Sequence, residues 1–185
     1  DAAPQAPQAP QAPPVPSWAV DRETRPLTVA ALNANAKVVA AARGPFDFVL
    51  WGDSITDFIH MRAQAAFDRA FGGNAVALGV GGNTVEELAG RLMRGREKPR
   101  WDPRVAALLV GINNLNWSKT EPAEKLEYLL TWMRAVMPTT KIIVMGLLPC
   151  TRVDVRSVNE RYRALAAKLG CTYVDCGAGM SRSEE

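Results

Sequence analysis

A serine at position 54 stands where an apolar run gives way to a helical pattern, in the sequence LWGDSIT at 50–56. A serine that begins a helix after a strand projects its hydroxyl from the top of the sheet, and its backbone N–H lies in the positive field of the helix start. These groups are what acyl transfer needs as a nucleophile and as one oxyanion donor. Taken alone, Ser54 also fits the simpler role of a helix N-cap.

Two more polar loops follow apolar runs further along the chain. One is GVGGNT at 79–84, whose glycines let the backbone approach a ligand closely and offer it N–H groups. These glycines are out of phase with the Gly-x-Gly-x-x-Gly pattern, and the loop lacks the Gly-Lys-Ser/Thr of a phosphate-binding P-loop. The other loop carries Asn113, whose amide could donate into a catalytic crevice or simply complete a turn.

A scaffold that could position these loops is visible in the alternation of apolar runs with helical periodicity. Largely apolar runs predict five strands, at 46–51, 75–78, 105–110, 141–147 and 171–174. Apolar residues at helical spacing, with proline or glycine near several ends, predict helices at 28–43, 61–71, 85–93, 122–136 and 155–169. Strands that are apolar along their length and alternate with helices predict an α/β fold, whose parallel sheet is covered on both faces.

Right-handed crossovers turn this alternation into a three-layer α/β/α sandwich. In such folds ligands bind outside the carboxyl ends of the strands, near a switch in strand order. Ser54, the 79–84 loop and Asn113 follow three different strands of the predicted sheet. We therefore expect these three segments to converge at one edge of it.

Together the three loops resemble the first three signature blocks of the SGNH/GDSL hydrolases. The segments that carry the resemblance are GDSIT at 52–56, GVGGNT at 79–84 and GINN at 111–114. The likeness is greatest to the catalytic subunits of the type I platelet-activating-factor acetylhydrolases and their relatives, and KIIVMGLLP at 141–149 extends it. The resemblance implies a flavodoxin-like sheet with five strands in the order 2-1-3-4-5.

The resemblance also assigns roles to individual residues. It implies that Ser54 is the nucleophile, and that Gly82 and Asn113 complete an oxyanion hole with the Ser54 N–H. Asp53 is implied to be structural, tying its loop by hydrogen bonds. Asn114 stands where many members of the family have aspartate, a difference that the acetylhydrolase-like group tolerates.

The family's last block, Asp-x-x-His followed by a closing helix, is absent from the sequence. The histidine of that block accepts the serine proton and its aspartate orients the histidine. The single histidine here, His60, lies six residues after Ser54, which is ~9 Å along a helix axis and on another side of the helix. We interpret His60 as a surface or partner-contact residue and Asp175 as a loop-capping residue. A missing closing helix would leave one face of the sheet underpacked.

Two hypotheses about function follow. The leading one is a serine esterase that removes acyl groups, often acetyl, from a lipid or a carbohydrate, with a histidine from a continuation beyond Glu185 as its base. Such an esterase needs no metal and no cofactor. The alternative is a catalytically inactive structural or binding module that keeps the fold, because the Asp-x-x-His block is absent.

Composition excludes several other classes of protein. The 185 residues carry a net charge of +3 without a basic block, so there is no nucleic-acid footprint. No apolar run approaches the ~20 residues of a membrane span. Cys150, Cys171 and Cys176 are too few for a disulfide scaffold and lack zinc-site spacing. One pair could bridge in a secreted protein, or all three could be small buried apolar residues.

The N-terminal segment differs in composition from the rest of the chain. Residues 1–16 are rich in proline, with Pro-Gln-Ala repeats, and favour polyproline II. We expect residues 1–25 to be an extended tail or linker and residues 26–185 to be an SGNH hydrolase-like domain that is incomplete at its C-terminus. The tail could be a solvated spacer, a docking strand for a protein partner, or a glycan-bearing stalk. A homo-oligomer is a further expectation, drawn from the family resemblance.

Two further features bear on localisation. The chain begins with Asp1 in place of methionine, and Asn116-Trp117-Ser118 matches the N-glycosylation pattern. With the proline-rich tail, they favour an extracellular or secretory-pathway location, and the cytoplasm is the alternative.

Overall fold

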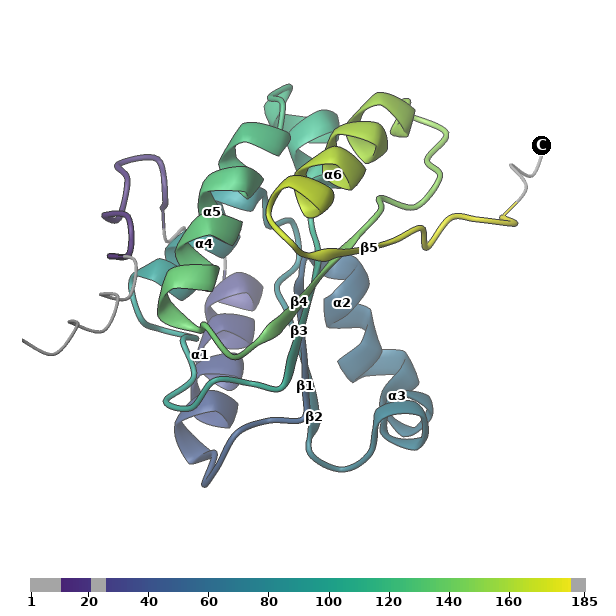
Figure 1. The fold of residues 1–185 in the computed structure, drawn as a ribbon. Coiled ribbons are helices and arrows are strands. Elements are labelled where there is room, and N and C mark those ends of the chain that lie inside the picture. The colour runs from purple at the N-terminus through teal and green to yellow at the C-terminus, as the bar shows by residue number, and fades with distance from the viewer. Residues whose placement is uncertain (1–10, 21–25, 181–185) are drawn as a thin grey trace, which may run out of the picture.

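The computed structural model describes residues 11–20 and 26–180, and its centre is a five-stranded parallel sheet (Figure 1). The strands are β1 (Phe48–Gly52), β2 (Ala75–Gly79), β3 (Val105–Leu109), β4 (Lys141–Met145) and β5 (Thr172–Val174). They lie in the order β2-β1-β3-β4-β5, and each neighbouring pair is parallel. The α/β class and the strand order 2-1-3-4-5 expected from the sequence are therefore confirmed.

Helices on both faces of the sheet complete the three layers. They are α1 (Pro26–Ala41), α2 (Ser54–Phe58), α3 (Gln64–Phe71), α4 (Val85–Met93), α5 (Ala123–Val136) and α6 (Arg156–Lys168), with two π-helical turns, η1 (Ile59–Ala63) and η2 (Asn114–Ser118). In Figure 1, α1, α4, α5 and α6 lie on one side of the sheet, and α2 and α3 lie on the other. Within the described ranges, no helix is both long enough and apolar enough to cross a membrane.

The helix expected over 61–71 is part of a longer helical segment. Helical backbone already begins at Ser54, directly after β1, and the π turn η1 joins α2 to α3. Ile55, Ile59 and Phe67 pack against the α2–α3 face of the sheet. The π turn between α2 and α3 interrupts the regular 3.6-residue period of apolar positions. The expected start of the helix at residue 61 depended on that period.

The two faces of the sheet are covered unequally. The larger apolar cluster lies between the sheet and α4, α5 and α6, and the smaller one lies under α2 and α3. On the smaller side, α2 and α3 pack over β1 and β2. Ile143 and Met145 of β4 are only half-buried there, and Val174 of β5 is 40% exposed. On this face the described helices cover β1 and β2 more completely than β4 and β5.

Residues 11–20 form a strap that lies against the domain. Ala19 is fully buried, and its carbonyl oxygen accepts a hydrogen bond of 2.9 Å from Arg94 Nε. The backbone N–H of Val20 donates to the carbonyl oxygen of Glu86, at 3.2 Å. The end of the strap is thereby fixed to α4.

Aromatic contacts fix the strap to α5 as well. The Tyr128 hydroxyl donates to the Pro14 carbonyl oxygen at 2.8 Å, and the Trp18 ring meets the Tyr128 ring edge-on, with 5.6 Å between centroids. Part of the segment expected to be an extended tail thus packs on the domain. The rest of that segment, at 1–10 and 21–25, lies outside the described residues.

Candidate active site

A cavity of about 420 Å³ opens at the carboxyl ends of β1, β2 and β3. It is lined by residues of four segments, namely Thr28, Ser54, Gly81, Gly82, Asn83, Thr84, Glu87, Asn113, Trp117 and Ser118. The fold therefore brings Ser54, Gly82 and Asn113 to a single cavity, although the sequence separates the first from the last by 59 residues. This edge of the sheet is where ligands bind in open α/β folds.

Ser54 is the first residue of α2 and lies partly exposed at the cavity. Asp53 caps the helix, since its Oδ1 accepts a hydrogen bond of 3.0 Å from the Ile55 N–H. The N–H of Ser54 stands at the first helical position, where the helix itself provides no acceptor. A substrate oxygen at the cavity could accept from this group.

Close packing fixes α2 against the strand ends. A Cβ on Gly52 would lie 2.1 Å from Thr56 Oγ1 and 2.5 Å from the Leu109 carbonyl oxygen. A Cβ on Gly79 would lie 2.0 Å from the backbone nitrogen of Asp57. Only glycine fits at these two positions, and the absence of side chains there lets the Ser54 helix sit directly on β1 and β2.

Burial changes the acidity of Asp53. The residue is 1% exposed, and desolvation raises the pKa of its carboxyl from 3.8 to about 6, against the opposing effects of the Ile55 N–H and of the Arg91 charge. Oδ2 is buried without a hydrogen-bond partner among the described residues. Ionisation of the buried Asp53 carboxyl therefore destabilises the folded state.

Replacing Asp53 with asparagine is expected to stabilise the fold at pH 8 and to change its stability little at pH 4. The folded pKa lies above the unfolded one, so the penalty for ionisation develops between about pH 4 and pH 6 and persists above. Asparagine keeps the capping oxygen and removes that penalty, which a shift of this size sets at about 2–3 kcal/mol. Guanidinium unfolding of both proteins at the two pH values measures the difference.

The control for this prediction is Asp68→Asn, which alters an exposed carboxylate on α3. Its effect on the free energy of unfolding should be small and similar at pH 4 and pH 8. An Asp53→Asn variant that is equally destabilised at both pH values would show that the charge of Asp53 is needed for the cap.

The second loop is a tight turn joined firmly to α4. The Asn83 N–H donates to the Val80 carbonyl oxygen at 3.2 Å, and Gly82 has a φ of 80°, in the left-handed region that favours glycine. The backbone N–H and the hydroxyl of Thr84 both donate to Glu87 Oε2, at 2.7 and 3.1 Å. This reciprocal cap starts α4 and holds the loop at the cavity.

Asn113 is buried and spans the gap between the second and third loops. Its Nδ2 donates to the Asn83 carbonyl oxygen at 2.9 Å. A side-chain amide has two N–H groups, so this bond orients the amide and leaves a second N–H for a ligand. The arrangement suits an oxyanion donor whose position is set in advance.

The neighbouring Asn114 is fully buried and connects η2 to α4. Its Oδ1 accepts from the Val85 N–H at 3.0 Å, and its Nδ2 donates to Glu86 Oε2 at 2.7 Å and to Thr120 Oγ1 at 3.0 Å. Asparagine at this position both donates and accepts, so all of these contacts are satisfied without a charge. The difference from the aspartate of many family members is therefore structurally compatible with the site.

A buried ion pair contacts the strand ends and the loop that form the site. The sequence did not predict it. Arg91 of α4 and Glu97 have side chains 1% and 0% exposed, and their guanidinium and carboxylate pair through two bonds, of 2.9 and 2.7 Å. Arg91 also donates to the carbonyl oxygens of Gly52 and Leu78, and to Asn83 Oδ1. One side chain thus connects the ends of β1 and β2 to the glycine-rich loop. The one sequence signal was that Arg91 falls on the apolar side of the predicted helix, three residues after Leu88.

His60 and Asp175 lie outside this cavity. His60 is exposed on η1, and its Nδ1 is 3.0 Å from Gln64 Oε1. Asp175 Oδ1 accepts from the Gly177 N–H at 3.1 Å, which agrees with a loop-capping role. Asp175 lines a separate cavity of about 460 Å³ beyond β4 and β5.

In the described part of the chain, no group of three histidine, cysteine or acidic side chains could hold a metal ion.

Comparisons with known proteins agree with this architecture. Platelet-activating factor acetylhydrolase IB subunit alpha2 of Rattus norvegicus is 36% identical over 76 residues, which are 41% of this chain and 33% of the relative. The Gallus gallus subunit is 33% identical over 118 residues, which are 60% of this chain and 51% of the relative. The chain thus spans about a third to a half of the length of these curated relatives.

Solved structures share the fold. A GDSL-like lipase from Bacteroides thetaiotaomicron superposes with a TM-score of 0.67 at 19% identity, over 83% of this chain and 81% of that one. The sequence profile of the GDSL-like lipase/acylhydrolase family matches residues 50–185, which is more than half of the chain. The chain therefore belongs to the GDSL-like lipase/acylhydrolase family.

Proposed function

We propose that this chain forms the nucleophile and oxyanion half of a serine ester hydrolase, with Ser54 as the nucleophile. The observation that carries the proposal is the convergence of Ser54, Gly82 and Asn113 on one cavity at the carboxyl ends of three strands. Membership of an acylhydrolase family supports the reaction class. The names of the acetylhydrolase relatives support an acetyl or other short acyl group as the part that is removed.

In the proposed reaction the Ser54 hydroxyl oxygen attacks the ester carbonyl carbon, while its proton passes to a histidine base. The carbonyl oxygen becomes an oxyanion, which accepts hydrogen bonds from the N–H groups of Ser54 and Gly82 and from the Asn113 amide. When the tetrahedral intermediate collapses, the alcohol leaves with the proton. Water then hydrolyses the acyl–Ser54 ester, releases the acid and restores the hydroxyl.

The base in this proposal is a histidine from a continuation beyond Glu185. His60 is a poor candidate for the base, because it is exposed on η1 and does not line the cavity. Asp53 is not suited to orient a base either, because its Oδ1 is engaged in capping Ile55. The proposal therefore assigns Asp53 to loop structure and leaves proton transfer to the added segment.

A fluorophosphonate probe tests the proposal on the full natural chain. The serine oxygen of an active esterase displaces fluoride from phosphorus, and the phosphonyl group stays on that oxygen. We expect mass spectrometry of the digested protein to place the label on the peptide that contains Ser54, together with loss of p-nitrophenyl acetate turnover. A label on another serine, or turnover that survives complete labelling, contradicts the proposal. A chain that is neither labelled nor active fits the non-catalytic module instead.

A further inference from the structure

The guanidinium of Arg91 contacts two of the three segments that form the proposed oxyanion hole. Its Nη1 donates to the Gly52 carbonyl oxygen and to Asn83 Oδ1, each at 3.0 Å. Gly52 lies two residues before Ser54 in the sequence. Asn83 directly follows Gly82. A single nitrogen atom therefore links the backbone that carries the Ser54 N–H to the backbone that carries the Gly82 N–H.

Asn83 extends this connection to Asn113 in the third segment. The side-chain oxygen of Asn83 accepts from Arg91, while its backbone carbonyl oxygen accepts from Asn113 Nδ2 at 2.9 Å. Both asparagines are buried, and a hydrogen bond is stronger in such surroundings than in water. The route from the guanidinium to the third proposed donor thus consists of two hydrogen bonds that meet at one residue.

The remaining donors of the guanidinium fix its orientation. Nε and Nη2 donate to the two carboxylate oxygens of Glu97, and Nη2 also donates to the Leu78 carbonyl oxygen at 2.6 Å. A guanidinium has five N–H groups in one plane, and each of them has an acceptor here. A rigid planar group that is engaged in this way holds its acceptors at set positions relative to one another.

We propose that Arg91 and Asn83 are positioning residues, which fix the three oxyanion donors of the proposed site relative to one another before the substrate binds. This inference deepens the proposed function and rests on it. An oxyanion hole lowers the barrier only when its donors already point to where the charge develops. Loss of the Asn83 link would let the Gly82 and Asn113 donors move relative to Ser54. Such a loss lowers kcat and leaves binding of the uncharged ester little changed.

The kinetic test compares variants of Asn83 in the full natural chain. Asn83→Ala removes the acceptor for Arg91 and keeps the backbone oxygen that Asn113 binds. We expect it to lower kcat for p-nitrophenyl acetate about 10- to 100-fold and to change KM less than about threefold. Asn83→Asp should recover most of this loss, because its carboxylate still accepts from the guanidinium. A second variant, Glu97→Gln, weakens the anchor of the guanidinium and should lower kcat by about threefold.

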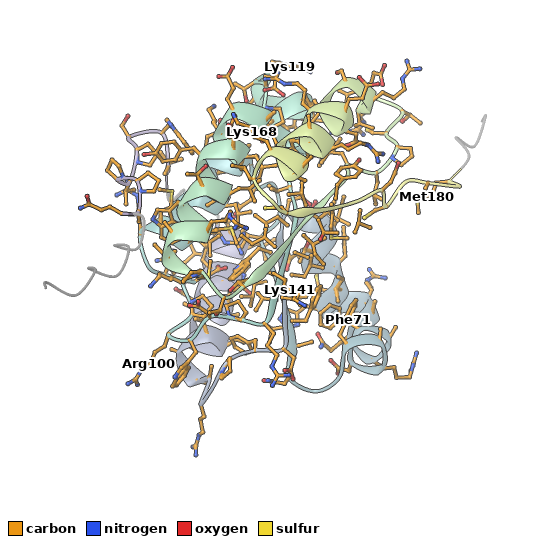
Figure 2. All side chains as sticks on the ribbon, in the orientation of Figure 1. Phe71, Arg100, Lys119, Lys141, Lys168 and Met180 are labelled. Carbon is orange, nitrogen blue, oxygen red and sulfur yellow. The ribbon has the colours of Figure 1, made fainter. Side chains whose placement is uncertain are left out.

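The matched control is Asn74→Ala. Asn74 also connects the chain next to β1 and β2, since its Nδ2 donates to the Pro45 carbonyl oxygen at 2.9 Å. This bond lies at the amino ends of the two strands, at the opposite edge from the cavity. Figure 2 shows Phe71, three residues before Asn74, well below Lys119, which ends η2. Asn74→Ala should leave kcat within about twofold of the unmodified protein.

A second measurement follows the Asn113 amide itself and needs no turnover. Nuclear magnetic resonance of protein labelled with ¹⁵N-asparagine reports its side-chain N–H groups, and the spectrum of Asn113→Ala identifies their signals. We expect Asn83→Ala to speed their exchange with water about tenfold, because the amide is held less firmly. Asn83→Asp and Asn74→Ala should leave the exchange rate nearly unchanged.

Two results would overturn the positioning role. One is a kcat that stays within twofold in both Asn83→Ala and Glu97→Gln while their thermal midpoints show folded proteins. The other is an Asn113 amide whose exchange with water is the same in Asn83→Ala as in the unmodified protein. A natural chain that hydrolyses no ester refutes the proposed function instead, and the amide exchange still decides whether Asn83 holds Asn113 in place.

Discussion

Ser54→Ala is expected to lower ester turnover by about 10⁴-fold or more, to the level that substrate binding and the oxyanion donors alone can sustain. The substitution removes one oxygen from a side chain that is already partly exposed at the first position of α2. The helix keeps its Asp53 cap, so the fold should be unaffected. Initial rates with p-nitrophenyl acetate, together with the thermal midpoint of each protein, separate loss of chemistry from loss of structure.

The matched control for Ser54 is Ser157→Ala. Ser157 is also a helical serine, but it lies exposed on α6 and does not line the cavity. Its loss should leave turnover within about twofold of the unmodified protein, because surface substitutions rarely matter. If Ser54→Ala keeps most of the activity and Ser118→Ala abolishes it, the nucleophile is the other serine of the cavity and our assignment is wrong.

Glu97→Ala is expected to destabilise the fold by about 3–5 kcal/mol, the largest stability effect that we predict. The substitution leaves the Arg91 guanidinium buried, with its charge uncompensated. Glu97→Gln should cost less, because the amide oxygen can still accept one of the two hydrogen bonds. Urea unfolding followed by circular dichroism gives the free energies of unfolding for the three proteins.

An exposed ion pair provides the comparison for Glu97. Lys168 and Glu127 pair on the surface of α6 and α5, with side chains 65% and 34% exposed. Lys168→Ala should change the free energy of unfolding by no more than ~1 kcal/mol, as is usual for exposed pairs. A similar small change for Glu97→Ala would mean that water reaches Arg91 once its partner is removed.

The sequence predicted the α/β class because largely apolar runs alternate with helical patterns, and the family resemblance supplied the strand order. The boundaries of α4 were predicted to the residue, since Thr84 and the glycine loop mark its start. The convergence of Ser54, Gly82 and Asn113 could also be expected, because all three follow strands of one parallel sheet. These features depend on local pattern, and local pattern is what a sequence displays.

The features that were not predicted depend on contacts between distant segments. Arg91 contacts Gly52 and Leu78, which lie 39 and 13 positions away in the sequence, and periodicity does not indicate such partners. The helix start at Ser54 was expected from the first motif, but the π turn η1, which joins α2 to α3, was not predicted.

The strap has a consequence for the order of events during synthesis. Pro14 leaves the ribosome 114 residues before Tyr128, the side chain that binds its carbonyl oxygen. At about 5–20 residues per second, the proline-rich segment waits roughly 6–23 s for that partner. A proline-rich sequence needs no burial to stay soluble in the meantime, because the polyproline II conformation that it favours is fully hydrated. The strap is thus synthesised well before its partner on α5, and its sequence suits a nascent chain that must wait.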